Sequence, residues 1–160
     1  TSASGDHSLK VVDAASGQPF WPSFQYRGFR LTSDASLRFV IKLEPGAVVE
    51  VNVRDQLVQP FKQGPQVRLD ADGTLTANGY PLDVAIPTGE WIEVEIHAPL
   101  GSASPGFYSL SVRLPDGTAR SYTHLPYHET ALETLTYIGF LSFGAKDAVY
   151  FLDDLTLVGE

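Results

Sequence analysis

Apolar and polar residues alternate with a period of two over several short stretches of this chain. The clearest are residues 37–43, 48–54, 90–96 and 107–114. Because successive side chains of a β-strand point to opposite faces, this alternation predicts strands with one buried face each. The residues predicted to point inward are Leu37, Phe39, Ile41, Leu43, Val49, Val51, Val53, Ile92, Val94, Ile96, Tyr108, Leu110, Val112 and Leu114.

Tight-turn signals separate these stretches. Asp72-Gly73, Asn78-Gly79 and Asp116-Gly117 each stand between β-like runs, as an Asx-Gly pair does in a hairpin. About ten short strands with such turns between them are typical of an all-β sandwich or barrel. The 160 residues suit one domain, spanning residues 1–160.

Residues 149–158 form the longest β-like run and are rich in aromatic and branched side chains, so they predict a central, largely buried strand. Asp153 and Asp154 interrupt this run, and strict alternation points at least one of them inward. A buried carboxylate must be paired, hydrogen-bonded or bound to a metal ion.

Charge and composition narrow the functional classes. A formal net charge of −8 argues against nucleic-acid and anionic-membrane partners, which need basic surfaces, and weighs less strongly against sulfated or uronate-rich polymers. The absence of cysteine excludes a disulfide framework and thiol catalysis. No apolar run approaches the roughly 20 residues of a membrane-spanning helix. Because there is no methionine, we expect a piece excised from a larger multidomain protein.

Four segments resemble a known family. SGDHSLKVVD (residues 4–13) and GEWIEVEI (89–96) are similar to an opening and a central strand of concanavalin A-like, carbohydrate-binding jelly rolls. YIGF (137–140) and FLDDL (151–155) resemble the paired closing strands of that family. The resemblance implies a two-sheet antiparallel β-sandwich of the jelly-roll type. It also implies a secreted protein, extracellular or periplasmic, that accompanies a polysaccharide-degrading catalytic domain.

In similar jelly rolls, an aspartate of the closing strand often binds a structural Ca²⁺ together with oxygens of the N-terminal segment. Asp153 matches that position, and Asp6 is a candidate second carboxylate. The alternative is that Asp153 accepts backbone N–H bonds, or pairs with Lys10 or Arg38, without an ion.

Candidate ligand contacts fall into three groups. Trp91, Glu93 and Glu95 are outward residues of one predicted strand, and side chains two apart share a face at about 6.6–7 Å. Asn52, Arg54 and Asp55 are predicted to supply hydrogen bonds to sugar hydroxyls on the same face. Trp21 is the best candidate for stacking on a sugar ring, because nearby prolines favour a loop there.

The leading hypothesis is a non-catalytic carbohydrate-binding or accessory module, with a neutral or mildly charged polysaccharide or oligosaccharide as ligand. A first alternative is a glycoside hydrolase with Glu93 and Glu95 as nucleophile and acid. The catalytic signature of such hydrolases has a central aspartate that this strand lacks, so an ordinary solvated charged face is favoured there. A second alternative is a structural spacer without a ligand.

Overall fold

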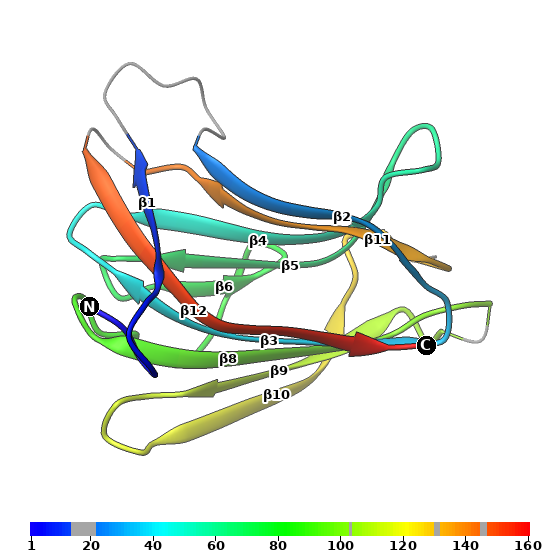
Figure 1. The fold of residues 1–160 in the computed structure, drawn as a ribbon. Coiled ribbons are helices and arrows are strands. Elements are labelled where there is room, and N and C mark those ends of the chain that lie inside the picture. Colours follow the sequence, from blue (N-terminus) through cyan, green and yellow to red (C-terminus); the bar gives the residue numbers. More distant parts are fainter. Residues whose placement is uncertain (14–21, 103, 130–131, 145–146) are drawn as a thin grey trace.

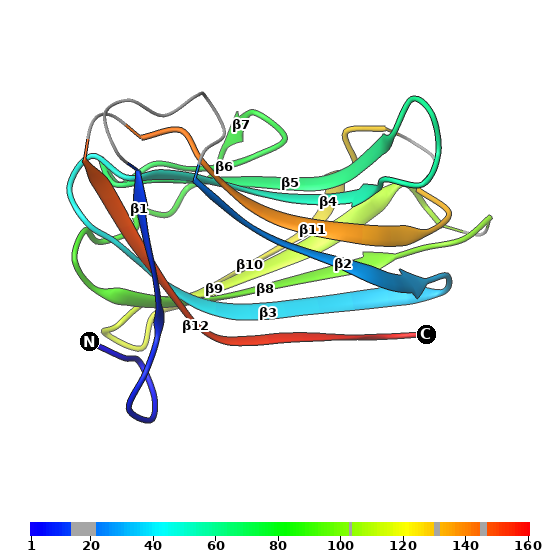
Figure 2. The same cartoon turned by 45° about the horizontal axis from the view of Figure 1, so that its top comes forward.

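The chain folds into two stacked antiparallel sheets of six strands each (Figures 1 and 2). The computed structural model describes residues 1–13, 22–102, 104–129, 132–144 and 147–160. Sheet A has the order β1 (Leu9–Asp13), β12 (Ala148–Gly159), β3 (Asp34–Leu43), β8 (Trp91–Pro99), β9 (Phe107–Arg113) and β10 (Ala119–Pro126). Sheet B has the order β2 (Ser23–Leu31), β11 (Leu135–Ser142), β4 (Val48–Asp55), β5 (Lys62–Asp70), β6 (Leu75–Ala77) and β7 (Tyr80–Pro81). The predicted two-sheet jelly roll is confirmed.

The core lies between the sheets and follows the alternation of the sequence. All but one of the residues predicted to point inward are buried, and Leu114, just beyond the end of β9, is half-buried against the core. Phe39 of sheet A and Phe140 of sheet B meet edge to face across the interior, with ring centroids 4.9 Å apart. No helix in the described residues is long and apolar enough to cross a membrane.

The closing strand β12 differs from its prediction as a central, largely buried strand. β1 pairs with only its first half, from Ala148 to Leu152, and a bulge follows between Asp153 and Thr156. Beyond the bulge, β12 pairs with β3 alone among the described strands, and Val158 is 62% exposed. Because the bulge breaks the alternation, Asp153 is only half-buried and Asp154 is exposed. The prediction of an inward carboxylate was wrong.

Candidate functional site

The two groups of predicted ligand residues lie on opposite surfaces of the sandwich. Asn52 and Arg54 belong to β4 in sheet B, whereas Trp91, Glu93 and Glu95 belong to β8 in sheet A (Figure 1). Each group points away from the core, and the two sheets are stacked back to back. The prediction of one shared face was therefore wrong, because alternation separates inward from outward without telling which sheet a strand joins. Trp21 lies outside the described residues.

The outer surface of sheet B gathers polar side chains from four adjacent strands. Tyr137 on β11 stands in register with Arg27 on β2 and with Arg54 on β4. One row further along, Gly139 stands between Gln25 and Asn52, and Asn52 is opposite Gln66 on β5. We call this group the sheet B face; its members are Gln25, Arg27, Asn52, Arg54, Gln66 and Tyr137.

Tyr137 lies at the centre of the sheet B face beneath two guanidinium groups. The Cζ atoms of Arg27 and Arg54 lie 5.2 and 5.3 Å from the centroid of its ring, within the range of cation–π attraction. These neighbours leave Tyr137 only 2% exposed. Burial raises the pKa of the Tyr137 phenol, and the positive charges of Arg54 and Arg27 oppose that change. The phenol is therefore protonated at neutral pH.

Amide oxygens and rings, rather than carboxylates, hold the two arginines. Arg54 donates from Nε and Nη2 to the Oδ1 atom of Asn52, at 3.3 and 3.0 Å, and also lies over the ring of Phe61. Arg27 donates from Nη2 to the Oε1 atom of Gln25. Among the described residues, no carboxylate comes within ion-pair distance of either guanidinium.

The electrostatic surroundings of Arg54 follow from this arrangement. Partial burial lowers the pKa of the Arg54 guanidinium, and the coulombic influence of Tyr137 and Glu50 raises it again. Glu50 is itself engaged, because it accepts a hydrogen bond of 2.7 Å from the Nδ2 atom of Asn52. The sheet B face thus presents positive charge that nearby groups do not neutralise through direct contact, which is what recognition of an anion requires.

Asp55, the next residue along β4, does not join the sheet B face. It is 5% exposed, and its carboxylate accepts hydrogen bonds from the hydroxyls of Thr134 and Thr136 and from the backbone N–H of Leu57. Its carboxylate is therefore engaged within the protein, and its role as a ligand contact stays a prediction. The side chain ties the start of the loop after β4 to the segment that leads into β11.

On sheet A, the candidate carboxylates are engaged within the protein. Glu93 forms ion pairs with Arg38, at 2.8 Å, and with Arg113, at 3.9 Å. Glu95 accepts a hydrogen bond of 3.0 Å from the hydroxyl of Ser36. Trp91 packs beside Lys42, whose ammonium lies 5.8 Å from the ring centroid. This arrangement fits the solvated charged face favoured from the sequence.

The geometry around Asp153 favours the hydrogen-bonded alternative over the calcium site. One carboxylate oxygen accepts the backbone N–H groups of Ala3 and Ser4, at 2.8 and 3.2 Å, and the other accepts the N–H of Asp154. The bond from Ala3, more than the others, lowers the pKa of Asp153. Asp6 is exposed, and the described residues hold no cluster of three metal-binding side chains. Because both oxygens of Asp153 already accept N–H groups, the residues present do not form a set of oxygen ligands that fits Ca²⁺. Calcium binding stays an untested prediction.

Four members of the sheet B face were missed from the sequence, namely Gln25, Arg27, Gln66 and Tyr137. β11 is buried along its whole length, so it carries no alternation from which an outward side could be read. β2 begins directly after Pro22 and lies at the edge of sheet B. The available signals were the polar residues at alternate positions of β2 and the spacing of Tyr137 and Gly139, in which a glycine leaves room for a neighbouring ring.

Comparison with known proteins shows the fold. No protein-family model matches the chain, and no curated protein matches it. The marine PL-14 alginate lyase from Aplysia kurodai is similar, with a TM-score of 0.67, 9% identity, and coverage of 99% of this chain and 85% of that one. A lysine-and-tyrosine double mutant of the alginate lyase Aly36B, in complex with alginate tetrasaccharide, gives a TM-score of 0.60, 11% identity, and coverage of 96% and 81%. CG-16, a homodimeric agglutinin from chicken liver, gives a TM-score of 0.53 and 12% identity, with coverage of 85% of this chain and 99% of that one. The chain therefore shares the two-sheet jelly-roll fold of these three proteins.

Proposed function

We propose that the sheet B face binds an acidic polysaccharide, such as a uronate polymer. The observation that carries this proposal is the pair Arg27 and Arg54, whose guanidinium groups flank Tyr137 without a carboxylate partner among the described residues. A planar guanidinium matches the two oxygens of a carboxylate. The net charge of −8 belongs to the whole chain, whereas binding depends on the charge of the surface that meets the ligand.

The neighbouring side chains suit the rest of a sugar unit. Gln25 and Gln66 carry half-buried amides, which both donate to and accept from hydroxyl groups. Asn52 is fully buried and serves instead to hold Arg54 in place. Phe61 is 38% exposed beside Arg54 and offers an apolar surface to the C–H face of a sugar ring. Rows of outward residues across neighbouring strands form an extended surface, which suits a polymer.

The comparisons add support. The two similar lyases act on alginate, a polymer of uronic acids, and one of them is seen with an alginate tetrasaccharide. A binding role without catalysis fits the sheet B face, because hydrogen bonds and ring contacts hold its two arginines in place. Under this proposal the chain works outside the cell as an accessory module beside a catalytic domain.

Affinity electrophoresis tests the binding. We expect retardation in gels that contain a polyuronate, no retardation with a neutral glucan, and weaker retardation at high salt. Arg54→Ala and Arg27→Ala each remove a charge-assisted contact worth about 1.5–3 kcal/mol, so the affinity should fall roughly 10- to 150-fold. Arg38→Ala on sheet A is the matched control and should bind like the wild type. Absence of retardation, or an equal loss in the control, would overturn the proposal.

A second candidate function, polysaccharide lyase activity, is favoured by Tyr137. Elimination from a uronate passes the C5 proton to a base, for which the carboxylate of Glu50 beside Asn52 is available, forms a C4–C5 double bond, breaks the C4–O bond and protonates the leaving oxygen. A protonated phenol between two arginines suits the last of these roles, while the guanidiniums hold the carboxylate. Because Tyr137 is 2% exposed, a substrate must first displace an arginine side chain, so binding remains the leading proposal.

Ultraviolet absorbance of the unsaturated product separates the two functions. If the chain is a lyase, polyuronate incubated with it gains absorbance, and Tyr137→Phe abolishes that gain while retaining the affinity. If retardation occurs without a rise in absorbance for the wild type, the chain is a binding module.

A further inference from the structure

Arg27 and Arg54 lie on the same cross-strand row of sheet B, two strands apart. β11 runs between β2 and β4, and Tyr137 on β11 is the register partner of both arginines. Adjacent strands are separated by about 4.8 Å, so the backbones that carry the two arginines lie roughly 10 Å apart. Both guanidinium groups rest against the ring of Tyr137, with Cζ atoms 5.2 and 5.3 Å from its centroid. The two positive charges are therefore no farther apart than the sum of these distances.

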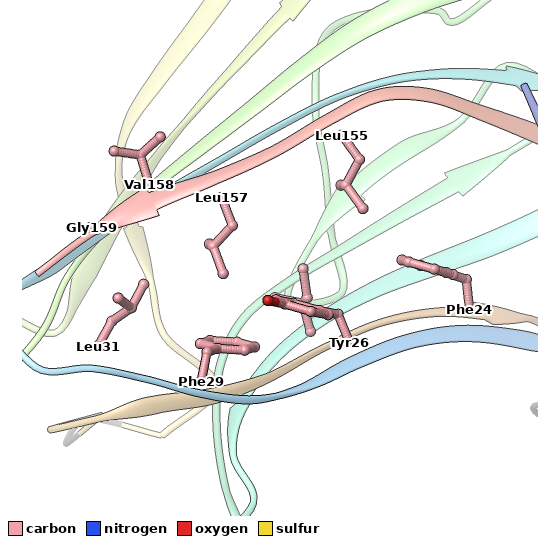
Figure 3. A pocket seen from close by; sticks show the side chains of 9 residues that line it. Phe24, Tyr26, Phe29, Leu31, Leu155, Leu157, Val158 and Gly159 are labelled. Atoms are coloured by element: carbon pink, nitrogen blue, oxygen red, sulfur yellow. The ribbon is translucent and has the colours of Figure 1, made fainter. Parts of the chain in front are cut away.

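The neighbours of Arg27 along β2 fix it on the outer surface. Figure 3 shows Tyr26 and Phe29 pointing from β2 into an apolar cleft of about 530 Å³, towards Leu155 and Leu157 on β12. The rings of Tyr26 and Phe29 stack with centroids 5.1 Å apart. Because these side chains are held between the sheets, Arg27 points to the outside of sheet B.

The β4–β5 loop (residues 56–61) limits the directions in which a polymer can lie on the sheet B face. Arg54 is the last residue but one of β4, and just beyond it this loop rises away from the sandwich (Figures 1 and 2). Leu57 in the loop is 75% exposed, and the ring of Phe61 lies 4.8 Å from the Cζ atom of Arg54. A chain lying along β4 would meet the loop, whereas a chain that crosses the strands runs alongside it.

A flat polyuronate presents its carboxylates in a pattern that fits the spacing of the two arginines. When each sugar is joined through equatorial bonds, successive units turn over, so the carboxylates of every second unit point to the same side. Two units of such a chain cover a length close to two strand spacings, roughly 10 Å. One guanidinium can donate to both oxygens of one carboxylate. Two carboxylates separated by one sugar unit can therefore engage one arginine each.

We infer, on the basis of the proposed function, that the sheet B face binds three consecutive units of a polyuronate that crosses β2, β11 and β4. The carboxylates of the two outer units bind Arg27 and Arg54, one on each, and the middle unit lies over Tyr137. Once one carboxylate is bound, the second binds within the same complex, so the two contacts strengthen each other. A disaccharide has its two carboxylates on opposite sides and engages only one arginine at a time.

Nuclear magnetic resonance titration with oligomannuronates of two, three and four units tests the length of the ligand, since mannuronate units are joined through equatorial bonds. We expect the affinity to rise at least about 10-fold from two units to three, and much less from three to four. Arg27→Ala and Arg54→Ala should each remove that rise. Either variant should lower the affinity for the disaccharide only slightly, because the other arginine remains.

Arg30→Ala is the matched control for the direction of the chain. Phe29 and Leu31, on either side of Arg30, line the apolar cleft, so Arg30 points to the outer side of β2, further along the strand from Arg27. If the polymer crosses the strands, Arg30→Ala binds the trisaccharide like the wild type. A loss of affinity in Arg30→Ala but not in Arg54→Ala would place the polymer along β2 and overturn this arrangement.

The length series separates failure of this binding mode from failure of polysaccharide binding itself. If polyuronate retards the protein but the disaccharide and the trisaccharide bind equally well, the two arginines act separately and the arrangement is overturned. If neither the polymer nor any oligomer binds, the proposed function is overturned as well. Circular dichroism confirms the folding of each variant. Arg27→Gln and Arg54→Gln keep part of the side chain over Tyr137 and replace any alanine variant that fails to fold.

Discussion

The ring of Tyr137 lies so close above Gly139 that a Cβ atom added to the glycine would stand 2.3 Å from the phenolic oxygen. No real side chain tolerates that approach, so a residue without a Cβ is required beneath the ring. Gly139 therefore makes room for the Tyr137 ring. The ring in turn positions Arg27 and Arg54, whose guanidinium groups lie against it.

Gly139→Ala should displace the Tyr137 ring. We expect the free energy of unfolding, measured by urea denaturation, to fall by about 1–3 kcal/mol from overpacking, with a loss of polyuronate affinity. In a Tyr137→Val background, where the ring is gone, the same substitution should cost much less. Equal costs in both backgrounds would show that the ring and the glycine are not coupled.

Asp55→Ala should destabilise the fold. The substitution leaves the hydroxyls of Thr134 and Thr136 and the N–H of Leu57 without their buried acceptor, at an expected cost of about 2–3 kcal/mol in urea denaturation. Asp116→Ala, which removes an exposed turn carboxylate, is the control and should cost about 1 kcal/mol or less. Similar losses for both variants would argue against a special role of the Asp55 network.

Attachment of the N-terminal segment should depend on pH through Asp153. Hydrogen bonds from Ala3 and other backbone groups lower the pKa of this carboxylate in the folded state. A group with a lowered pKa contributes stability above its unfolded pKa, about 3.9, and loses it as the pH falls through the folded value. The protection of the Ala3 and Ser4 amides against exchange, taken relative to their intrinsic rates at each pH, should therefore fall only in acid. Asp153→Asn should show fast exchange at neutral pH as well; unchanged protection there would contradict the assignment.

Calcium binding can be decided by thermal melting in EDTA and in excess Ca²⁺. An ion at 100 times its dissociation constant would add about 2.7 kcal/mol of stability. Because the oxygens of Asp153 already accept N–H bonds, we expect superimposable curves. A higher melting temperature in Ca²⁺ that Asp153→Asn abolishes would instead establish the site.

Glycoside hydrolysis by Glu93 and Glu95 predicts reducing ends released from polysaccharides. We expect none from the wild type, since Arg38 and Arg113 pair with Glu93 and Ser36 donates to Glu95. Release that Glu93→Gln abolishes without changing the melting temperature would restore the hydrolase alternative.

The alternation of apolar and polar residues correctly predicted the buried side chains wherever a strand has one buried and one solvent-exposed face. Phe39, Val51, Val94 and Leu110 are all fully buried as predicted, because each follows its polar neighbours with a period of two. The same rule failed at Asp153, where a bulge adds residues to one strand. The sequence of apolar and polar residues there gives no sign of the bulge.

The composition of the candidate site was harder to predict than the fold. The outward position of Arg54 follows from its own strand, but its meeting with Arg27 and Tyr137 depends on which strands become neighbours. That order is fixed by long-range packing of the whole sandwich. Tyr137 was hidden for a further reason, since arginines cover its outward side and leave it as buried as a core residue.

The order of strands also bears on how the chain acquires its structure during synthesis. β11 stands between β2 and β4, and β12 stands between β1 and β3, so the last two strands of the sandwich are the ones that join early segments in each layer. Neither layer can be completed until residues 135–159 have left the ribosome. A nascent chain stalled before residue 135 should therefore remain sensitive to protease, and folding that depends on such distant pairings should be slow.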